Sequence, residues 1–228
     1  MDFSPRILIT AGPTHEPIDS VRYIANRSSG RMGLALAEAA SRRGWPTTLL
    51  LGPAPIAPPE DSHVRTIRFQ TTADLQSLLR LNWPQHDVLF MAAAVADYRA
   101  KAGGTDPAQP ALKIPRRDQP LTLELEPTPD LLADLSSITK PHQTVIGFAL
   151  EPAARLLTSA REKLTRKKLH AIVANPLETM DAEQVTATVL LRDGRQFAAG
   201  PDLPKREFAR WLLTVMEPTL RAAGQAVC

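Results

Sequence analysis

The sequence predicts an α/β fold, a Rossmann-like three-layer sandwich built on a mostly parallel sheet. Two patterns favour this fold. Several short apolar runs lack polar alternation, as expected for strands covered on both faces, and segments with helical periodicity separate them. A flap hairpin near the middle of the chain, and a hairpin plus a helix at its C-terminal end, complete the expected fold. The strands of the main sheet are expected at residues 6–10, 47–51, 64–69, 88–94, 145–149 and 171–175.

Helices are expected where apolar residues recur on one helical face. Thr72 is expected to cap the second helix, because a threonine hydroxyl accepts a hydrogen bond from a free backbone N–H group. For the third helix, Thr128 is the expected cap, with Pro129 at the first helical position and Asp130 in the first turn. The helices are predicted at residues 32–44, 72–81, from 128 onward, 152–169 and 205–223. The Asp193-Gly194 pair predicts the turn of the C-terminal hairpin.

Length and charge limit the classes of function. The chain has 228 residues and is expected to form one domain over 1–228, with a flap at about 99–127. It has no apolar run long enough for a membrane span and no signal peptide, so a cytoplasmic protein without a membrane partner is expected. The one cysteine, Cys228, is interpreted as an incidental free thiol. The net charge of +3 is modest, which favours a small polyanion over nucleic acid as the ligand.

A long polar segment joins the first strand to the first helix, as at many ligand sites. Ser28, Ser29 and Gly30 lead into this helix. Free backbone N–H groups and the positive end of the helix dipole suit a phosphate or carboxylate there. The alternative is a serine that caps an ordinary surface helix. Neither GxGxxG nor GxxxxGK[ST] occurs, so a nucleotide would be held without these two loops.

A second candidate segment follows the apolar run at 88–94. In open α/β sheets, ligands bind beyond the carboxyl ends of the strands, so Asp97 is expected on the same rim as Asn26. The alternative is an aspartate that merely ends a strand. Phe148, in the run at 145–149, has an alternative role as a core residue.

Residues 99–127 are predicted to form a mobile flap. Glycines and prolines exclude a long helix there, while residues 112–114 and 121–125 alternate as the strands of a hairpin would. Lys113 lies on this flap, with Arg116 and Arg117 close behind it. The alternative is an edge strand whose charges protect it from aggregation.

Lys163 and Lys167 are four residues apart in a predicted helix and therefore share one face. Like charges at this spacing repel by a few tenths of a kcal/mol. A polyphosphate that lies between the two lysines would offset this repulsion. The alternative is a solvated surface helix.

Six motifs follow one another along the chain: ITAGPTHEPIDSVRYIANRSSGRMG, AAAVADYRA, LKI, TPDLL, VIGFA and KLTRKKLHAIVAN. In this order they resemble the phosphopantothenoylcysteine synthetase family. The resemblance covers nearly the whole chain and leaves no room for the flavin-binding decarboxylase half of fused relatives, which implies a free-standing synthetase without flavin. The family implies a ligase of coenzyme A biosynthesis that joins 4'-phosphopantothenate to L-cysteine. CTP first activates the carboxylate as an acyl-cytidylate with release of pyrophosphate, and the cysteine amine then attacks.

The resemblance also implies roles for individual residues. Lys113 matches the flap lysine that closes over the nucleotide, and Asn26 matches the asparagine that contacts the activated carboxyl group, so both are expected to be catalytic. The other implied nucleotide-binding residues are Asp97, Pro129, Asp130, Leu131, Leu132, Phe148, Lys163 and Lys167. The implied substrate-binding residues are Arg22, Asn26, Ser28, Ser29, Gly30, Ala93 and Ala94.

The family further implies Mg²⁺ or Mn²⁺ as a cofactor, with no residue assigned to the metal, and a preference for CTP over ATP. It implies a homodimer with shared active sites, in which Arg22 reaches the pantothenate of the neighbouring subunit. A separate phosphopantothenoylcysteine decarboxylase is a further candidate partner.

The chain departs from the family pattern in three segments, where relatives commonly read GFAAET, KNLD and IVAND. The departures include Leu150, Pro152, His170 and Pro176. Because of them, a nucleotide-binding or regulatory module of the same fold without turnover is the alternative. An NAD(P)-dependent reductase is disfavoured, because GxGxxG is absent and no tyrosine has a lysine four residues later.

Overall fold

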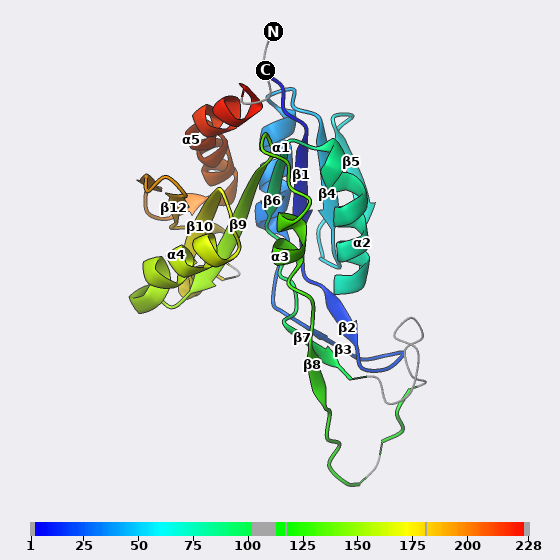
Figure 1. The fold of residues 1–228 in the computed structure, drawn as a ribbon. Helices are drawn as coiled ribbons and strands as arrows, with labels where there is room; N and C mark the ends of the chain where they lie inside the picture. The colour runs from blue at the N-terminus through cyan, green and yellow to red at the C-terminus, as the bar shows by residue number, and fades with distance from the viewer. Residues whose placement is uncertain (1–2, 102–112, 117, 181, 226–228) are drawn as a thin grey trace.

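The computed structural model describes residues 3–101, 113–116, 118–180 and 182–225, and its α/β architecture confirms the predicted fold class (Figure 1). The main sheet has eight strands in the order β13-β12-β10-β9-β6-β1-β4-β5. All neighbours from β10 to β5 are parallel, and β12 and β13 continue the sheet as antiparallel strands. The strands are β1 (Ile7–Ala11), β4 (Thr47–Leu51), β5 (Val64–Arg68), β6 (Val88–Met91), β9 (Thr144–Glu151), β10 (Ala171–Pro176), β12 (Thr188–Leu191) and β13 (Gln196–Ala198).

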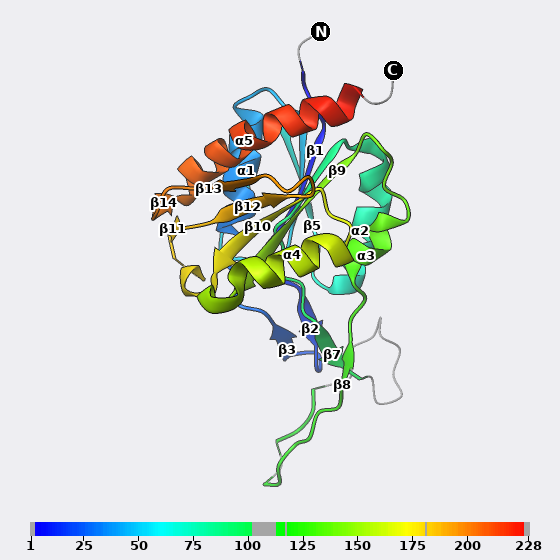
Figure 2. The ribbon, with the colours of Figure 1, turned by 60° about the vertical axis from the view of Figure 1, so that its left-hand side comes forward.

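Helices cover both faces of this sheet (Figure 2). One face packs against α1 (Arg31–Ser41) and α5 (Lys205–Gln225). The other face packs against α2 (Thr72–Asn82), α3 (Leu131–Ser136) and α4 (Leu156–Arg166). The strands therefore bury side chains on both faces, as their continuous apolar runs predict.

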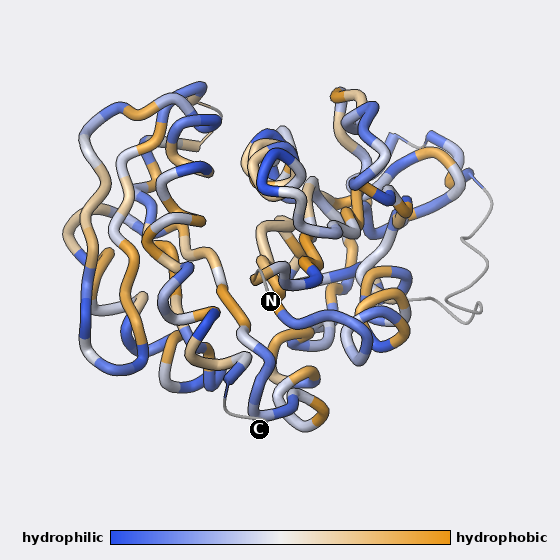
Figure 3. Tube along the Cα trace, turned by 90° about the horizontal axis from the view of Figure 1, so that it is seen from above, coloured by the Kyte–Doolittle hydropathy of each residue, from blue (hydrophilic) through white to orange (hydrophobic). Residues whose placement is uncertain are grey.

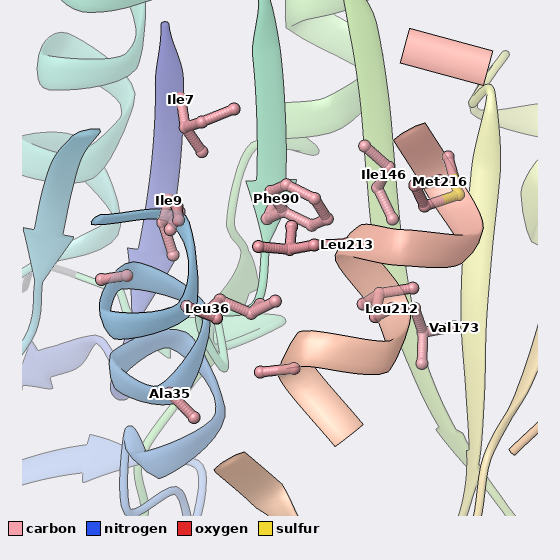
Figure 4. Close-up of a cluster of buried hydrophobic side chains, with 14 of the residues drawn as sticks. Ile7, Ile9, Ala35, Leu36, Phe90, Ile146, Val173, Leu212, Leu213 and Met216 are labelled. Atoms are coloured by element: carbon pink, nitrogen blue, oxygen red, sulfur yellow. The ribbon is translucent and has the colours of Figure 1, made fainter. Parts of the chain in front are cut away.

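Alternate residues of each strand enter opposite cores. Ile7 and Ile9 of β1 face the α1 and α5 layer, whereas Leu8 between them faces the α2, α3 and α4 layer. Seen from above, the apolar residues follow the strands and the inward sides of the helices (Figure 3). In the first core, side chains of the sheet meet those of the two helices (Figure 4). The contacting residues drawn there include Ile7, Ile9, Phe90, Ile146, Val173, Leu36, Leu212, Leu213 and Met216.

Two hairpins project beyond the carboxyl edge of the sheet and form what we call the arm, residues 15–25 and 98–127 as far as they are described (Figures 1 and 2). The first pairs β2 (His15–Pro17) with β3 (Tyr23–Ala25), and the second pairs β7 (Tyr98–Ala100) with β8 (Leu125–Pro127). The two hairpins touch through β2 and β7. Sequence reasoning missed β2 and β3, because they are three-residue strands in a polar segment.

The root of the arm is tied to the sheet and to α2. Ala94 donates its backbone N–H to Gly12 at 3.0 Å, and Thr14 donates to Ala94 at 3.2 Å. The buried Glu16 carboxylate accepts hydrogen bonds from the backbone and the hydroxyl of Thr72, at 2.8 and 2.7 Å. The arm therefore begins in a rigid, buried network.

The hairpin predicted in the flap is wrong in the residues that form its strands. Its strands are β7 and β8, so of the predicted run at 121–125 only Leu125 is in a strand. Residues 113–116 adopt no regular structure, and Leu112 and Arg117 lie outside the described residues. Pro115 and Pro120 lack the N–H group that a ladder requires, which explains why the alternating pattern misled.

Two predicted helix caps and one helix start are also wrong. Thr71, not Thr72, caps α2, and its hydroxyl accepts from Asp74 in a capping box. Asp130, not Thr128, caps α3. Helix α4 begins at Leu156 because residues 153–155 form a 3₁₀ turn after Pro152.

The remaining elements are small. β11 (Gln184–Val185) pairs with β14 (Leu203–Pro204), and two further 3₁₀ turns cover 83–85 and 177–179. None of the helices in the described part of the chain is long and apolar enough to cross a lipid bilayer.

Candidate functional site

A pocket of about 700 Å³ opens at the carboxyl ends of β1, β6, β9 and β10. The chain order of the strands reverses between β1 and β6, which is where open α/β sheets bind ligands. Its volume is within the range of small-molecule sites. Its walls come from the segments 25–32, 91–97, 128–132 and 148–150, with Lys163, Lys167, Asn175, Met180 and Lys205.

One wall is the N-terminus of α1. The serine-cap alternative is wrong, because Gly30 is the N-cap residue, with a φ of 70° and no capping side chain. A Cβ atom at Gly33 would lie 2.4 Å from the Cβ of Ala11, so only glycine permits this close approach of α1 to β1. The first backbone N–H groups of α1 are therefore directed to the pocket without a side-chain acceptor, as an anion site requires.

The opposite wall is the segment from Ala93 to Asp97, which we call the rim. Thr10 and Thr14 accept hydrogen bonds from the backbone N–H groups of Ala93 and Ala96, at 3.0 and 2.9 Å. Thr128 donates its backbone N–H to the carbonyl of Asp97 at 2.9 Å and its hydroxyl to that of Ala96. The rim is thus fixed from both sides before any ligand arrives.

Asn26 joins the two walls. Its Nδ2 donates a hydrogen bond to the carbonyl oxygen of Val95 at 2.8 Å. The structure therefore places Asn26 beside the rim that carries Asp97, as the strand-end rule predicts.

The two helix lysines each have a carboxylate partner. Lys163 lies 2.5 Å from Glu151 at the end of β9, and Lys167 lies 3.1 Å from Asp130 at the start of α3. Their mutual repulsion is therefore offset by neighbouring elements, which spacing alone does not reveal. Both ammonium groups are held at the wall of the pocket.

The pocket gathers fourteen of the sixteen residues singled out from the sequence. They are Asn26, Ser28, Ser29, Gly30, Ala93, Ala94, Asp97, Pro129, Asp130, Leu131, Leu132, Phe148, Lys163 and Lys167. Phe148 lines the pocket and also packs against the core, as its alternative role predicted. Arg22 and Lys113 do not line this pocket and lie on the arm.

Arg22 and the segment of Lys113 are joined through Asp19. The Asp19 carboxylate is buried and accepts from the backbone N–H groups of Val21, Arg22 and Ile114, at 2.9, 2.8 and 3.1 Å. Arg22 pairs with Asp19 at 2.8 Å and donates to the carbonyl of Ile114 at 2.6 Å. Burial alone would raise the pKa of Asp19, but these hydrogen bonds and the Arg22 charge lower it to about 2.

Sequence reasoning missed Asn175. Its Oδ1 atom is buried and has no hydrogen-bond partner among the described residues, and the residue lines the pocket at the end of β10. A buried acceptor without a donor is costly, which suits an atom that a ligand will satisfy. The strand-end rule that identified Asp97 would also have found Asn175.

The departure at His170 does not reach this pocket. His170 directly precedes β10 and does not line the pocket at the carboxyl end of that strand, and its ring accepts at Nδ1 from the backbone N–H of Val145 at 3.1 Å. Burial, and then the charge of Arg192, lower the pKa of His170 to about 4.

The described residues contain no group of three or more His, Cys, Asp or Glu side chains that could hold a metal ion. Mg²⁺ needs no such group when a triphosphate carries it, because it is usually held by one or two carboxylates together with phosphate oxygens and water. Asp97 and Asp130 line the pocket and could supply a carboxylate.

Comparisons with known proteins identify the family of the chain. Residues 4–219 match the family described as the DNA/pantothenate metabolism flavoprotein C-terminal domain. The chain belongs to this family. The membership expected from the motifs, in the phosphopantothenoylcysteine synthetase part of coenzyme A biosynthesis proteins, is confirmed.

Individual relatives support the family at the level of sequence and fold. The chain is 40% identical to the coenzyme A biosynthesis bifunctional protein CoaBC of Vibrio cholerae over 170 residues, which are 75% of this chain and 41% of that protein. It is 40% identical over 173 residues, 76% of this chain and 46% of the other, to a protein of an unknown prokaryotic organism named cysteine/cysteine sulfinic acid decarboxylase. The chain thus spans less than half the length of these curated relatives.

A solved structure has the same family fold. The C-terminal domain of a coenzyme A biosynthesis bifunctional protein CoaBC superposes with a TM-score of 0.79 at 35% identity, covering 96% of both chains.

Proposed function

We propose that this family member is a phosphopantothenate–cysteine ligase that uses CTP. The observation that carries the proposal is the large pocket near the β1–β6 switch point. It brings a free helix N-terminus, two lysines and the Asn26 amide into one cavity. These are the groups that activation of a carboxylate by a nucleoside triphosphate requires. The names of the CoaBC relatives support the pathway.

In the first step, the carboxylate of 4'-phosphopantothenate attacks the α-phosphate of CTP and pyrophosphate leaves. Two anions approach each other in this step, so positive charge must be present. The N-terminus of α1 would bind phosphate, and Lys163 and Lys167 would exchange their carboxylate partners in part for the triphosphate. Mg²⁺ or Mn²⁺, bound with the triphosphate, would supply further neutralisation of charge.

The nucleoside would occupy the part of the pocket between Asp97, Phe148 and Asn175. Phe148 offers an aromatic side chain for the base, and the unpartnered Oδ1 of Asn175 offers an acceptor for an N–H group. Cytosine carries such a donor in its amino group, as adenine does, so this acceptor suits CTP, and the assay below distinguishes CTP from ATP. Lys113, on the arm, would close over the nucleotide.

In the second step, the amine of L-cysteine attacks the acyl-cytidylate and CMP leaves. One N–H of the Asn26 amide is committed to Val95, which leaves the second N–H to stabilise the acyl oxygen as charge develops on it. The hydrogen bond to Val95 fixes the direction of this donor. The side chain does not compete with cysteine as a nucleophile.

We further propose that two copies of the chain associate through the arm. Six large hydrophobic side chains are exposed on it: Val21, Tyr23, Tyr98, Leu121, Leu123 and Leu125. An exposed apolar group of this kind marks a protein interface. Arg22 lies among them, outside the pocket of its own chain, so a second copy would allow it to reach the neighbouring pocket.

Pyrophosphate release tests the activity. The purified chain is incubated with Mg²⁺, 4'-phosphopantothenate, L-cysteine and one nucleotide at a time, and CTP is expected to give the fastest release. Lys163→Gln should slow the reaction, whereas Arg161→Gln removes a charge from the same helix outside the pocket and should not. Faster turnover with ATP would overturn the nucleotide assignment. CTP binding without pyrophosphate would instead support the alternative of a nucleotide-binding module.

A further inference from the structure

A second, smaller pocket of about 250 Å³ lies on the α3 side of β9 and β10, behind the wall of the large one. Ser136 ends α3, Lys140 lies in the loop after it, and Lys167 and Lys168 lie in the turn after α4. His170 precedes β10, and Arg192 follows β12. None of the described residues that line this pocket carries a carboxylate. The pocket is smaller than most small-molecule sites, so it suits an ion or a compact molecule.

The guanidinium of Arg192 is fixed in place in this pocket. Arg192 donates from Nε to the carbonyl of Leu169 at 2.8 Å and from Nη2 to the carbonyl of Lys168. These carbonyls orient the guanidinium but do not neutralise it. No ion pair with a described carboxylate is seen for the side chains of Lys140 and Lys168, whereas Lys167 is paired with Asp130.

His170 adds a donor rather than an acceptor. Because Nδ1 accepts from the backbone N–H of Val145, the proton of the neutral ring belongs on Nε2. The lowered pKa of His170, which burial and Arg192 cause, agrees with a positive local potential. Ser136 contributes a hydroxyl at the same wall.

The backbone at Lys168 suits a substitution that removes its charge. Lys168 has a φ of 51°, a conformation that asparagine adopts more readily than lysine.

We propose that this smaller pocket is a second anion site, which binds a small phosphate, either free or as the monoester of a small molecule. Lys140, Lys168 and Arg192 line the pocket and have no described carboxylate partner, which is the chemistry that recognises a phosphate dianion. The site does not depend on the ligase activity proposed above. It shares Leu132 and Lys167 with the large pocket.

The ring of His170 provides a reporter inside the site. The chemical shift of its Cε1 proton is followed by NMR while sodium phosphate is added at constant ionic strength, with chloride as the balancing salt. A bound phosphate stabilises the protonated ring, so the pKa of His170 should rise and the shift should saturate. Glycerol 3-phosphate in a parallel titration distinguishes a monoester from the free ion by which of the two binds more tightly.

Three variants test whether the NMR response to phosphate comes from this pocket. Lys140→Gln and Lys168→Asn should each weaken phosphate binding by about tenfold, the usual effect of losing one charge-assisted hydrogen bond. Arg166→Gln is the matched control, because Arg166 is exposed at the end of α4, two residues before Lys168, and does not line the pocket. It should change the dissociation constant less than twofold.

The proposal fails if chloride alone gives the same shift, or if the two lysine variants bind phosphate as tightly as the unchanged protein. Both lysines are exposed, and Lys168→Asn suits the local backbone, so loss of folding is not expected to obscure the result. Loss of CTP turnover in the earlier assay would leave this result unaffected.

Discussion

Asn26 and Val95 are joined by a 2.8 Å hydrogen bond from a side-chain amide to a backbone carbonyl. This bond connects the segment before α1 with the rim beyond β6, two parts of the chain nearly seventy residues apart. The amide is therefore already oriented when substrates bind. Such preorganised donors are the ones that contribute most to catalysis.

Replacing Asn26 with aspartate is expected to separate the two half-reactions. The variant should still form the acyl-cytidylate, but an anion near the developing oxyanion should slow attack by cysteine. Mass spectrometry of a quenched single turnover should show the intermediate accumulating. Because aspartate also faces the Val95 carbonyl, Asn26→Ala is needed beside it. Accumulation in both variants assigns the effect to the missing amide, and absence of both intermediate and pyrophosphate would place Asn26 in the first step.

Asp19→Asn is expected to release the segment that carries Lys113. The carboxylate accepts from three backbone N–H groups, and an amide nitrogen in place of Oδ2 can accept neither from the Ile114 N–H nor from the Arg22 guanidinium. Limited trypsin digestion should cut after Lys113 or Arg116 about tenfold faster in the variant. Asp118→Asn is the control, since it alters an exposed carboxylate of the same segment. Equal cleavage of all three proteins would show that Asp19 does not hold this segment.

His170 is expected to make stability depend on pH. Its pKa is about 4 in the folded chain and 6.5 ordinarily, so the unfolded chain binds the proton first as pH falls. The contribution is complete above pH 6.5 and is lost towards pH 4. His170→Asn keeps an acceptor for the Val145 N–H. Between pH 6.5 and pH 4, the free energy of unfolding of this variant should fall by about 1 to 3 kcal/mol less than that of the unchanged protein. Urea denaturation measures the difference. His86, whose pKa burial also lowers, is present in both proteins and cancels.

Val21→Glu is expected to weaken the dimer. Val21 is 61% exposed on the arm, and a charge there would have to be buried between two copies. Sedimentation velocity should show a monomer for this variant at concentrations at which the unchanged chain is dimeric. Leu81→Glu is the matched control, because Leu81 is 66% exposed on α2, away from the arm. If both variants remain dimeric, the arm is not the interface.

Mixing two inactive chains tests whether the site is shared. If Arg22 acts in the neighbouring pocket, a mixed dimer of Arg22→Ala and Asn26→Ala chains contains one intact site. Random exchange should then restore about a quarter of the activity of the unchanged protein. If Arg22 acts in its own chain, both sites of the mixed dimer are defective and no activity returns.

The central fold could be predicted because its strands are buried on both faces. Continuous apolar runs such as the one that contains β1 have no other common explanation, and the strand-end rule then placed Asp97 near Asn26. Local patterns could not show which of two neighbouring residues takes a role that suits both. Two adjacent threonines both suit a helix cap, and Thr71 caps α2 because the buried Glu16 carboxylate engages Thr72.

The site was predicted less completely for a similar reason. The partners of Lys163 and Lys167 come from β9 and α3, so only the folded chain shows that these lysines are ion-paired. The role of Asp19 depends on Ile114, ninety-five positions away, which no local spacing reveals.

The root of the arm has a mechanical consequence. The hydrogen bonds between Gly12, Thr14 and Ala94 that anchor it are also the ones that continue into the rim. A rotation of the arm about its root would break these buried hydrogen bonds, and water would not readily replace them. The arm is therefore joined rigidly to the wall of the large pocket, so a partner bound at its tip would restrict the motion of that wall.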